Sequence, residues 1–485
     1  MFELTLGPEE KRVRRTRRRD PVARFKPDKA AQLDAVAGCP ELQVPAGHLC
    51  RDVGRWVERL DTSRVEAGYS SLGRHGYHPK RVLAVWVYAS LIGLHYATEV
   101  ARAMRTDAAF RLLSGGHAYS EGVLKRFRQQ QEALFQDALE QTVRLAGHAG
   151  LLDAQDLAVD SVRLRAHGST KQVRTLHRSK ERLEELARQD VDALEPQARQ
   201  VHAAKVHKHT EAVRLCQQRG ASSVVLTSPA AALMKFPSGA GLPGHRATVA
   251  ACGQQARLVV GVLLDAAAVD YGHLEDAVRE ARRVLLKAGM PQQACLQVAA
   301  DAGYGSKADL VFAQSEASWV DVLVAEPQAA GEPTGAGGLF GRNDFRLDAA
   351  ERSVLCPAGR KMRGPLYDKA HGYDRFVGVG CDVCPLKPQC TRGRERNVTV
   401  DWDFERARAS MRQRMAQPGA RQRYNRRIAT VEPVFSSLED AMGYRRVSSR
   451  LPQTVKAEVL LKLLAHNLSR LITRQRLVLV LFRLS

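Results

Sequence analysis

The chain has 485 residues, which is long enough for two or three domains and a sizeable core. Its 74 Lys and Arg residues exceed its 52 Asp and Glu residues, and the resulting net charge of +22 favours a polyanionic partner such as nucleic acid over a basic surface kept only for solubility. No apolar run reaches the ~20 residues of a membrane-spanning helix, and no apolar segment of a secretory signal is apparent. The nine cysteines favour reduced thiols or a metal site. We therefore expect a cytoplasmic protein without a membrane partner.

The first 150 residues divide into a basic arm and a helical region. Residues 1–28 are predicted to form a flexible arm, because residues 11–19 hold seven basic side chains and no acidic one. Residues 29–150 show helical periodicity, with Pro79 in a first-turn position and Ser120 as the cap of a longer basic helix. That helix carries Lys125, Arg126 and Arg128. Short helices followed by a basic one fit a helix-turn-helix domain that binds DNA, although an ordinary helical bundle fits the periodicity equally well.

A single carboxylate interrupts the first strongly apolar strand pattern. Residues 157–159 read Leu-Ala-Val, Asp160 follows, and a strand-like alternation continues beyond it. Burying one carboxylate in an apolar strand is costly unless a cation shared with other carboxylates compensates its charge. Two partners stand downstream, Asp301 at the end of another apolar run and Glu432 in a helix-like segment. We therefore expect these three residues to come together around metal ions.

The pattern around Asp160 predicts an α/β domain built on a mixed sheet. After the first strand, residues 172–219 read as an inserted helical hairpin that is either solvated or in contact with DNA. The elements that follow are strands at 246–252 and 257–264, a helix at 272–289, a strand at 296–300, a helix at 306–315 and a strand at 319–325. This is the RNase H-like order, in which the first three strands are antiparallel and the ends of the first and fourth strands lie side by side. It places Asp160 beside Asp301, and we assign residues 151–326 and 400–475 to this domain.

Four cysteines lie between the two parts of this domain. Residues 327–399 are predicted to form a loop and a cysteine-containing insertion. The cysteines are Cys356, Cys381, Cys384 and Cys390. A C-x-x-C pair followed by a third cysteine, with a fourth in a Cys-Pro-Ala-Gly turn, suits a structural zinc site with four thiolates. Because a long gap follows the first cysteine, unligated thiols are an equal alternative.

The C-terminal part is predicted to be helical and contains Glu432. A basic helix is expected at 404–414, and residues 455–472 read as an apolar packing helix. The apolar face next to Glu432 consists of Val431, Phe435, Leu438 and Met442. Pro433 requires that a helix begins or bends near Thr430. Taken alone, Glu432 would be read as an exposed helix acid.

Three carboxylates held together match one kind of chemistry. They bind two Mg²⁺ or Mn²⁺ ions about 4 Å apart, one of which activates an attacking hydroxyl while the other stabilises the leaving oxygen of a phosphodiester. Asp160 and Asp301 would be shared ligands, and Glu432 would complete the second site. Water as the attacking group gives a nick, whereas a freed 3'-hydroxyl gives a hairpin or a joint to a target strand.

Five sequence blocks, in order, resemble one enzyme family. VDSVRLRAHGS, ADAGYGS and YNRRIATVEPVFSSLE resemble the three catalytic blocks of DDE transposases from bacterial insertion sequences. GYHPKRVLAVWVYASLIGL followed by FRQQ resembles their N-terminal domain, and CPAG with CDVCPLKPQCT resembles the cysteine block that one branch carries between the second Asp and the Glu. The resemblance extends from Gly76 onward. It implies an all-α DNA-binding domain followed by an α/β, RNase H-like catalytic domain with helical and cysteine-containing insertions.

The resemblance also implies roles for individual residues. Asp160, Asp301 and Glu432 would be the catalytic triad, and Tyr424 and Arg427 would contact a DNA phosphate near the cleavage site. Further DNA contacts are expected from the basic side chains Arg126, Arg128, Arg445 and Arg446.

The chain departs from the family pattern at three places. The family often has Lys seven residues after its Glu, where this chain has Glu439, so that phosphate contact is missing or is made by Arg445 or Arg446. Residues 161–162 read Ser-Val where the branch usually has Gly-Thr, and residues 245–246 read His-Arg where Tyr-Asn is common. These departures allow for a copy that binds its DNA ends but cleaves them poorly.

We therefore expect a transposase that binds the terminal inverted repeats of its element and carries out two-metal DNA strand cleavage and strand transfer. Its partners would be double-stranded DNA, both element ends and target, and a second copy of itself, because both ends must be cut and joined in one complex. It would work at the nucleoid in the cytoplasm. The alternatives are a nuclease on the same fold that does not transpose, and a decayed or repurposed copy that only binds DNA.

Overall fold

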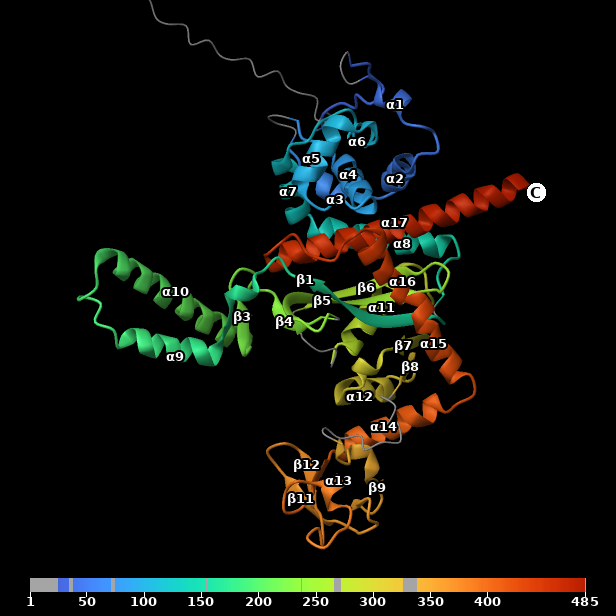
Figure 1. The fold of residues 1–485 in the computed structure, drawn as a ribbon. Coiled ribbons are helices and arrows are strands. Elements are labelled where there is room, and N and C mark those ends of the chain that lie inside the picture. Colours follow the sequence, from blue (N-terminus) through green and yellow to red (C-terminus); the bar gives the residue numbers. More distant parts are fainter. Residues whose placement is uncertain are drawn as a thin grey trace, which may run out of the picture.

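The computed structural model describes residues 25–34, 38–70, 75–153, 155–236, 238–265, 272–325 and 338–484. Residues 1–24 of the predicted basic arm and residues 327–337 of the predicted loop lie outside the described residues. Figure 1 shows helices over a central sheet, a helical hairpin that projects to one side and a small strand-containing module at the opposite end from the N-terminal helices. The sheet is the part that positions the candidate site.

The region before the sheet is helical, as predicted. Its helices are α1 (Pro40–Gln43), α2 (Leu49–Glu58), α3 (Ser63–Glu66), α4 (Pro79–Leu91), α5 (Ala97–Thr106), α6 (Ala108–Leu113), α7 (Glu121–Gln130) and α8 (Glu132–His148). Local signals set two of the starts. Pro79 is the first residue of α4, and the hydroxyl of Ser120 caps α7 by accepting a hydrogen bond from the amide of Val123. Both starts confirm the sequence predictions.

Among the described residues, the central sheet has six strands in a mixed arrangement. They are β1 (Leu157–Arg165), β4 (Ala232–Lys235), β5 (Gly241–Cys252), β6 (Leu258–Asp265), β7 (Leu296–Ala300) and β8 (Val320–Val324). Strand β5 lies between β1 and β6 and is antiparallel to both, and β7 and β8 extend the sheet on the other side of β1, parallel to it. The predicted strand order is confirmed, but β5 begins at Gly241 rather than at residue 246 and pairs there with β4.

Helices cover both faces of the sheet. The helices that pack on the sheet are α8 and α17 (Pro452–Leu484) on one face, and α11 (Leu274–Lys287) and α12 (Lys307–Ser315) on the other. Side chains of β1 alternate between the two cores, because successive residues of a strand point to opposite faces. Val162 and Leu164 lie in the first core, and Leu157 and Val159 lie in the second.

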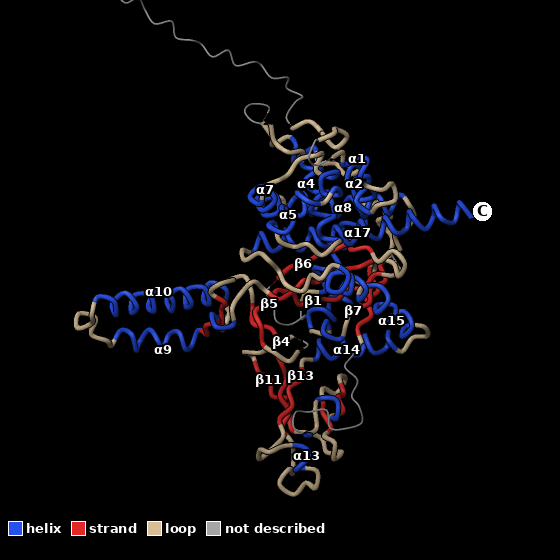
Figure 2. The backbone as a smooth tube through the Cα atoms, turned by 45° about the horizontal axis from the view of Figure 1, so that its top comes forward, coloured by secondary structure: helices blue, strands red, loops and turns tan. Residues whose placement is uncertain are grey.

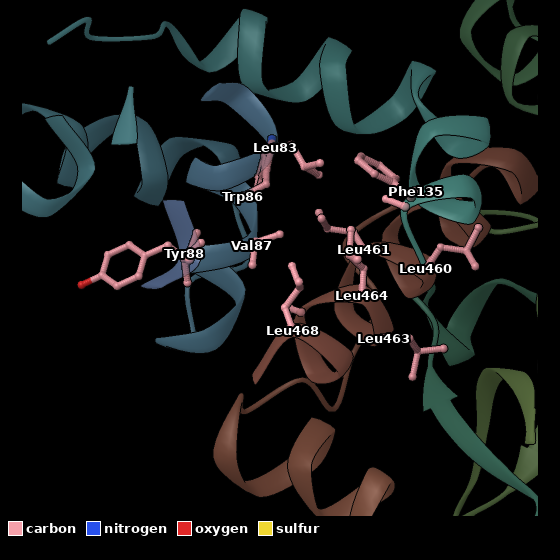
Figure 3. Close-up of a cluster of buried hydrophobic side chains, with 14 of the residues drawn as sticks. Leu83, Trp86, Val87, Tyr88, Phe135, Leu460, Leu461, Leu463, Leu464 and Leu468 are labelled. Atoms are coloured by element: carbon pink, nitrogen blue, oxygen red, sulfur yellow. The ribbon is translucent and has the colours of Figure 1, made fainter. Parts of the chain in front are cut away.

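The N-terminal helices share their core with the sheet. Figure 3 shows Trp86 and Val87 of α4 and Phe135 of α8 gathered around Leu461 and Leu464 of α17, and the same cluster continues into β1, β5 and β6. Each such fully buried side chain stabilises the fold by about 2 kcal/mol. The domain boundary predicted at residue 150 therefore does not separate two hydrophobic cores. Helix α17 also continues to Leu484, beyond the helix end predicted at residue 472.

The predicted helical hairpin is confirmed. It consists of α9 (Leu176–Ala187) and α10 (Pro196–Arg219), with β2 (Val173–Thr175) and β3 (Ser223–Val225) pairing at its base. Figures 1 and 2 show it projecting away from the sheet. Its small core lies near the base, where Leu215 and Cys216 of α10 pack on Val224.

The cysteine-containing insertion is a small module with its own core, where the sequence predicted only a loop and a zinc site. Its elements are β9 (Arg346–Asp348), β10 (Ser353–Leu355), β11 (Arg363–Asp368), β12 (Tyr373–Val377), α13 (Lys387–Cys390) and β13 (Asn397–Val400). Phe345, Val354 and Phe376 are among its buried side chains. Turns interrupt these short strands, so their alternation is too brief to be recognised in the sequence.

The chain returns from this module to the sheet through four consecutive helical segments. These are α14 (Trp402–Met415), α15 (Ala420–Thr430), α16 (Glu432–Ser436) and a π-helical turn, η5 (Ser437–Ala441), before α17. Helix α15 packs against β1 and β7, where the candidate site lies. Of the helices that the structure describes, none combines the length and apolar character needed to span a membrane.

Candidate active site

The sheet places two of the three predicted carboxylates side by side. Strands β1 and β7 are parallel, and Val159 lies opposite Ala300 in their register. Asp160 and Asp301 are the next residues along the chain from that pair. Both carboxylates therefore stand at the point where β7 ends and β1 continues, as the predicted strand order required.

A break between two helices brings Glu432 to the same place. Helix α15 ends at Thr430, and Glu432 is the first residue of α16, with Pro433 at its second position. Because proline lacks an amide hydrogen, the first turn of a helix accommodates it at no cost. The predicted break near Thr430 is confirmed.

Two contacts that the sequence did not reveal fix this break against the sheet. The hydroxyl of Thr430 donates a hydrogen bond to Oδ1 of buried Asp156 at 3.2 Å, just before β1 begins. The Nε group of Arg257 donates to the carbonyl of Ala429 at 3.1 Å. These contacts join the end of α15 to the start of β1 and to the β5–β6 turn, and so position Glu432 relative to Asp160.

One guanidinium contacts all three carboxylates. Arg427 of α15 reaches Asp160 with Nη1–Oδ2 at 2.9 Å, Asp301 with Nη2–Oδ1 at 3.4 Å and Glu432 with Nη1–Oε1 at 3.9 Å. The Arg427 side chain is only 11% exposed, whereas those of Asp301 and Glu432 are each 48% exposed. We call these four residues the carboxylate cluster. It is closed toward the protein and open toward solvent.

The electrostatics of the carboxylate cluster are unbalanced. Carboxylates are ionised at neutral pH, so three negative charges face one positive charge. Burial alone would lower the pKa of Arg427, but the nearby acids and Tyr424 outweigh burial and hold this pKa above its ordinary value. The ring of Tyr424 lies 5.7 Å from the Arg427 guanidinium carbon. The excess negative charge suits a divalent cation with oxygen ligands.

The carboxylate cluster has suitable donor atoms for a metal ion but not a geometry that is ready to bind one. The carboxylate oxygens of the cluster are the donor type that Mg²⁺ and Mn²⁺ prefer. Within the described ranges, however, no group of three or more His, Cys, Asp or Glu side chains stands ready to hold a metal ion. In the carboxylate cluster, the guanidinium of Arg427 takes the position that a shared cation would need.

Two residues of the carboxylate cluster, Asp160 and Asp301, face a cleft of about 710 Å³, which we call the catalytic cleft. Asp160, Asp301 and Glu439 line it together with Arg163, Arg165 and Arg445. Arg163 and Arg165 were not among the residues predicted to contact DNA. Arg163 and Arg165 are two residues apart in a predicted strand, and this spacing could have shown that both side chains lie on one face of β1.

The segment after Glu432 is tied to the edge of β1 beside this cleft. The amide of Arg165 donates to the carbonyl of Arg445 at 3.2 Å, and the amide of Val447 donates to the carbonyl of Arg165 at 2.8 Å. Arg445 also bonds to Asp440 Oδ1 at 2.9 Å, and exposed Arg446 bonds through Nε to the carbonyl of Ala166 at 3.3 Å. Arg445 therefore lines the same cleft as Asp160 and Asp301, whereas Arg446 lies at the far end of β1.

The two arginines predicted on α7 have different surroundings. Arg126 is exposed. Arg128 is 5% exposed, donates to the carbonyl of His95 at 2.6 Å and stacks over the ring of Trp86 at 4.9 Å. These contacts give Arg128 a structural role between helices, so it cannot reach DNA from this position. Helical periodicity did not reveal that its face of α7 is the buried one.

The four cysteines come together at one end of the module. Cys356, Cys381, Cys384 and Cys390 are unpaired and line the same small pocket. Burial, followed by the neighbouring thiols, raises the pKa of Cys390, and Arg396 opposes this shift. The four cysteines thus line one pocket, but among the described residues they do not form a group ready to hold a metal ion, and the choice between a zinc site and unligated thiols stays a prediction.

Two protein-family models match the chain. A model described as "Transposase DDE domain" matches residues 355–472, and one described as "Transposase domain (DUF772)" matches residues 39–130. The chain is a DDE-type transposase. The first match includes Glu432 and Arg427 of the carboxylate cluster, while Asp160 and Asp301 lie before it. The second match covers helices α1 to α7 of the transposase.

Comparisons with whole proteins add little. No curated protein matches the transposase. Among solved structures, a piggyBac transposase in a synaptic complex with hairpin DNA aligns at 9% identity and a TM-score of 0.30, over 87% of this chain and 73% of that chain. A likeness at this level supports no argument about fold or function.

Proposed function

We propose that the transposase cleaves and joins DNA with two divalent metal ions bound by Asp160, Asp301 and Glu432. The observation that carries this proposal is the meeting of three carboxylates, from β1, β7 and α16, on the single guanidinium of Arg427 at the mouth of the catalytic cleft. The sheet order β6-β5-β1-β7-β8, antiparallel and then parallel, supports an RNase H-like catalytic domain.

We assign different roles to the residues in and beside the catalytic cleft. When bound, two Mg²⁺ or Mn²⁺ ions supply an activated hydroxyl and stabilise the leaving oxygen of the phosphodiester. Arg163, Arg165 and Arg445 line the wall beside the carboxylates, where guanidinium groups can hold the phosphates of the cleaved strand in place. Tyr424 packs beside Arg427 and limits where that guanidinium can turn.

The DNA partner is proposed to be the terminal inverted repeats of a bacterial insertion sequence, followed by a target duplex. The net charge of +22 supports binding to a polyanion. Arg126, exposed on α7 in the segment that matches a transposase domain, is a candidate contact to the element end. Pairing of two ends for joining implies a dimer on DNA.

We further propose that the four cysteines hold one structural Zn²⁺. Thiolates are soft ligands that zinc prefers, and four of them line one pocket of a module with a small core of its own. Purified transposase should contain about one zinc ion per chain by elemental analysis. Cys381→Ser and Cys384→Ser should each lose it, whereas Cys295→Ser, outside the module, should retain it. If none of the three substitutions changes the zinc content, the cysteines of the module do not bind zinc and are unligated thiols.

The function is tested by Mg²⁺-dependent cleavage and joining of DNA that carries the element's own flanking ends. Asp301→Asn should abolish both reactions. Asp321→Asn is the matched control, because Asp321 stands on the neighbouring strand β8 and pairs with Arg423 at 2.7 Å. Cleavage without joining would favour a non-transposing nuclease. Binding of the ends without any cleavage by the unsubstituted protein would favour a decayed DNA-binding copy.

A further inference from the structure

We propose that Arg427 and the divalent metal ions compete for the same three carboxylates, and that a DNA phosphate draws Arg427 away so that metal binding depends on DNA. This inference rests on the proposed function, since it takes Asp160, Asp301 and Glu432 as the metal ligands. It makes Arg427 a positioning residue that governs access of the ions to the transposase.

The competition follows from the geometry. Mg²⁺ binds carboxylate oxygens at about 2.1 Å, and the same oxygens of Asp160 and Asp301 lie 2.9 and 3.4 Å from the Nη atoms of Arg427. Glu432 reaches Nη1 at 3.9 Å from a third direction. A cation shared by the three acids would therefore stand against the guanidinium, with neither room nor favourable charge between them. Ion entry requires that Arg427 turns away.

The cost of that movement depends on what else holds Arg427. Its Nε atom is buried and has no hydrogen-bond partner among the described residues. Its Nη groups face the carboxylates, and Asp160 is the closest of the three. The side chain is therefore held by the acids that the ions also need and by Tyr424, whose ring lies 5.7 Å from the guanidinium carbon. Hydrogen bonds between charged groups contribute enough to weaken ion binding by about 10- to 100-fold when they must be broken.

A displaced guanidinium needs another anion, because its surroundings are largely buried. The side chain of Arg427 is 11% exposed, and isolated charges are unfavourable in such places. The anion that arrives with the substrate is a DNA phosphate, whose oxygens match the guanidinium fork as well as a carboxylate does. The arginines of the catalytic cleft, Arg163, Arg165 and Arg445, provide a positive wall that leads phosphates to this position.

Charge balance favours the exchange. With Arg427 in place, the cluster has two negative charges in excess, which attract a cation but do not balance a pair of divalent ions that also stand beside a guanidinium. When Arg427 pairs with a DNA phosphate, its positive charge is neutralised there and no longer repels the ions, which then face the three carboxylates. DNA and metal ions should therefore bind with positive cooperativity, and each should raise the affinity of the other by the same factor.

The experiment measures Mn²⁺ binding to the full chain by electron paramagnetic resonance, with and without a duplex of the element's flanking DNA, and with the duplex alone as the blank. The unsubstituted transposase should bind Mn²⁺ weakly alone and more tightly on DNA. Arg427→Ala should bind Mn²⁺ about 10- to 100-fold more tightly without DNA, and the added effect of DNA should disappear. Arg427→Lys, which keeps one positive charge without the fork, should lie between the two.

Arg423→Ala is the matched control. Arg423 stands one turn earlier on α15 and pairs with Asp321 rather than with the cluster, so its removal should leave Mn²⁺ binding unchanged. Two results would overturn the inference, and they differ in what else they overturn. If Asp301→Asn does not weaken Mn²⁺ binding, the proposed metal site fails and the competition fails with it. If Asp301→Asn weakens binding but neither Arg427 variant strengthens it, only the competition fails.

Discussion

Two clusters of charged residues in the transposase are built from similar groups but differ in their access to solvent. Asp160 and Asp301 of the carboxylate cluster face the catalytic cleft. The second cluster, which we call the sealed network, joins α17 to the N-terminal helices. Its members are Glu458, Lys462, Arg128, His95, Ser90, Ser448 and Ser449.

In the sealed network the carboxylate of Glu458 has four hydrogen-bond donors. Glu458 is fully buried and accepts hydrogen bonds from the amides and hydroxyls of Ser448 and Ser449 at 2.7–3.1 Å. Burial would raise the pKa of Glu458, but Arg128 and these hydrogen bonds hold it below its ordinary value. Lys462, one turn later on α17, donates to Ser90 Oγ and lies 2.9 Å from Nδ1 of His95. Burial lowers the pKa of Lys462 to about 7.

The two clusters differ in how completely their charges are paired, and this difference distinguishes charges that stabilise the fold from charges that bind a partner. In the sealed network the carboxylate of Glu458 has fixed donors and is closed to solvent. In the carboxylate cluster two acids are half-exposed and one guanidinium serves three carboxylates. Buried charge that is fully paired holds elements together, whereas an open excess of one sign marks a place where a partner of the opposite sign binds.

The largest expected effect is on catalysis. Asp160→Asn should reduce the rate of DNA cleavage by about 1,000-fold or more, because metal ions contribute several kcal/mol of transition-state stabilisation. The thermal unfolding midpoint should stay the same or rise, since one of three mutually repelling carboxylates is removed. Cleavage rates and thermal unfolding curves of the same preparation check both parts. A variant that loses stability together with activity would place Asp160 among structural charges.

The second effect is on stability. Glu458→Ala should lower the free energy of unfolding by about 3–5 kcal/mol, because it removes the acceptor of Ser448 and Ser449 and the anion near Arg128. Denaturant unfolding provides the measurement. Glu432→Gln is the comparison, and its half-exposed side chain should cost less than 1 kcal/mol. Equal losses in the two variants would remove the distinction between the clusters.

Acid should lower the stability of the folded chain through the buried histidine His466. His466 of α17 is 1% exposed and donates from Nε2 to the carbonyl of Arg257 at 2.8 Å, and burial lowers its pKa from 6.5 to about 4. Between these pH values the unfolded chain binds more protons at this position than the folded chain, so stability falls as the pH falls through this window. The unfolding midpoint should decrease from pH 7 to pH 5, and His466→Gln should flatten that decrease. His207→Gln, exposed on α10, should leave it unaltered.

The smallest effect concerns Glu439. Glu439→Lys places a cation in the catalytic cleft, at the position where the sequence resemblance led us to expect Lys. DNA binding should strengthen a few-fold, and its dependence on salt should steepen by about one counterion. Mn²⁺ binding should not change. A loss of Mn²⁺ binding in this variant would instead make Glu439 a ligand and widen the carboxylate cluster by one acid.

Sequence reasoning reached the parts of the site that depend on local signals. The apolar run before Asp160 and the one before Asp301 predicted two strands, and Pro433 predicted the helix break that presents Glu432. The order of elements then predicted which strands are neighbours, and the register of β1 with β7 confirms it.

Other features depend on contacts between distant segments and left no local pattern. Nothing in the α15 sequence shows that Arg427 turns toward β1 rather than toward solvent. The buried position of Arg128 depends on Trp86 of another helix. The hydrogen bond from Thr430 to Asp156 likewise joins residues whose partnership only the assembled fold defines.

The most direct test of the two-metal site is anomalous diffraction from Mn²⁺ in crystals of the transposase with an element end. Two peaks about 4 Å apart among Asp160, Asp301 and Glu432, with the guanidinium of Arg427 turned to a phosphate, are the predicted result. Peaks bound to other residues, or Arg427 still in contact with all three carboxylates while the ions are bound, would contradict it.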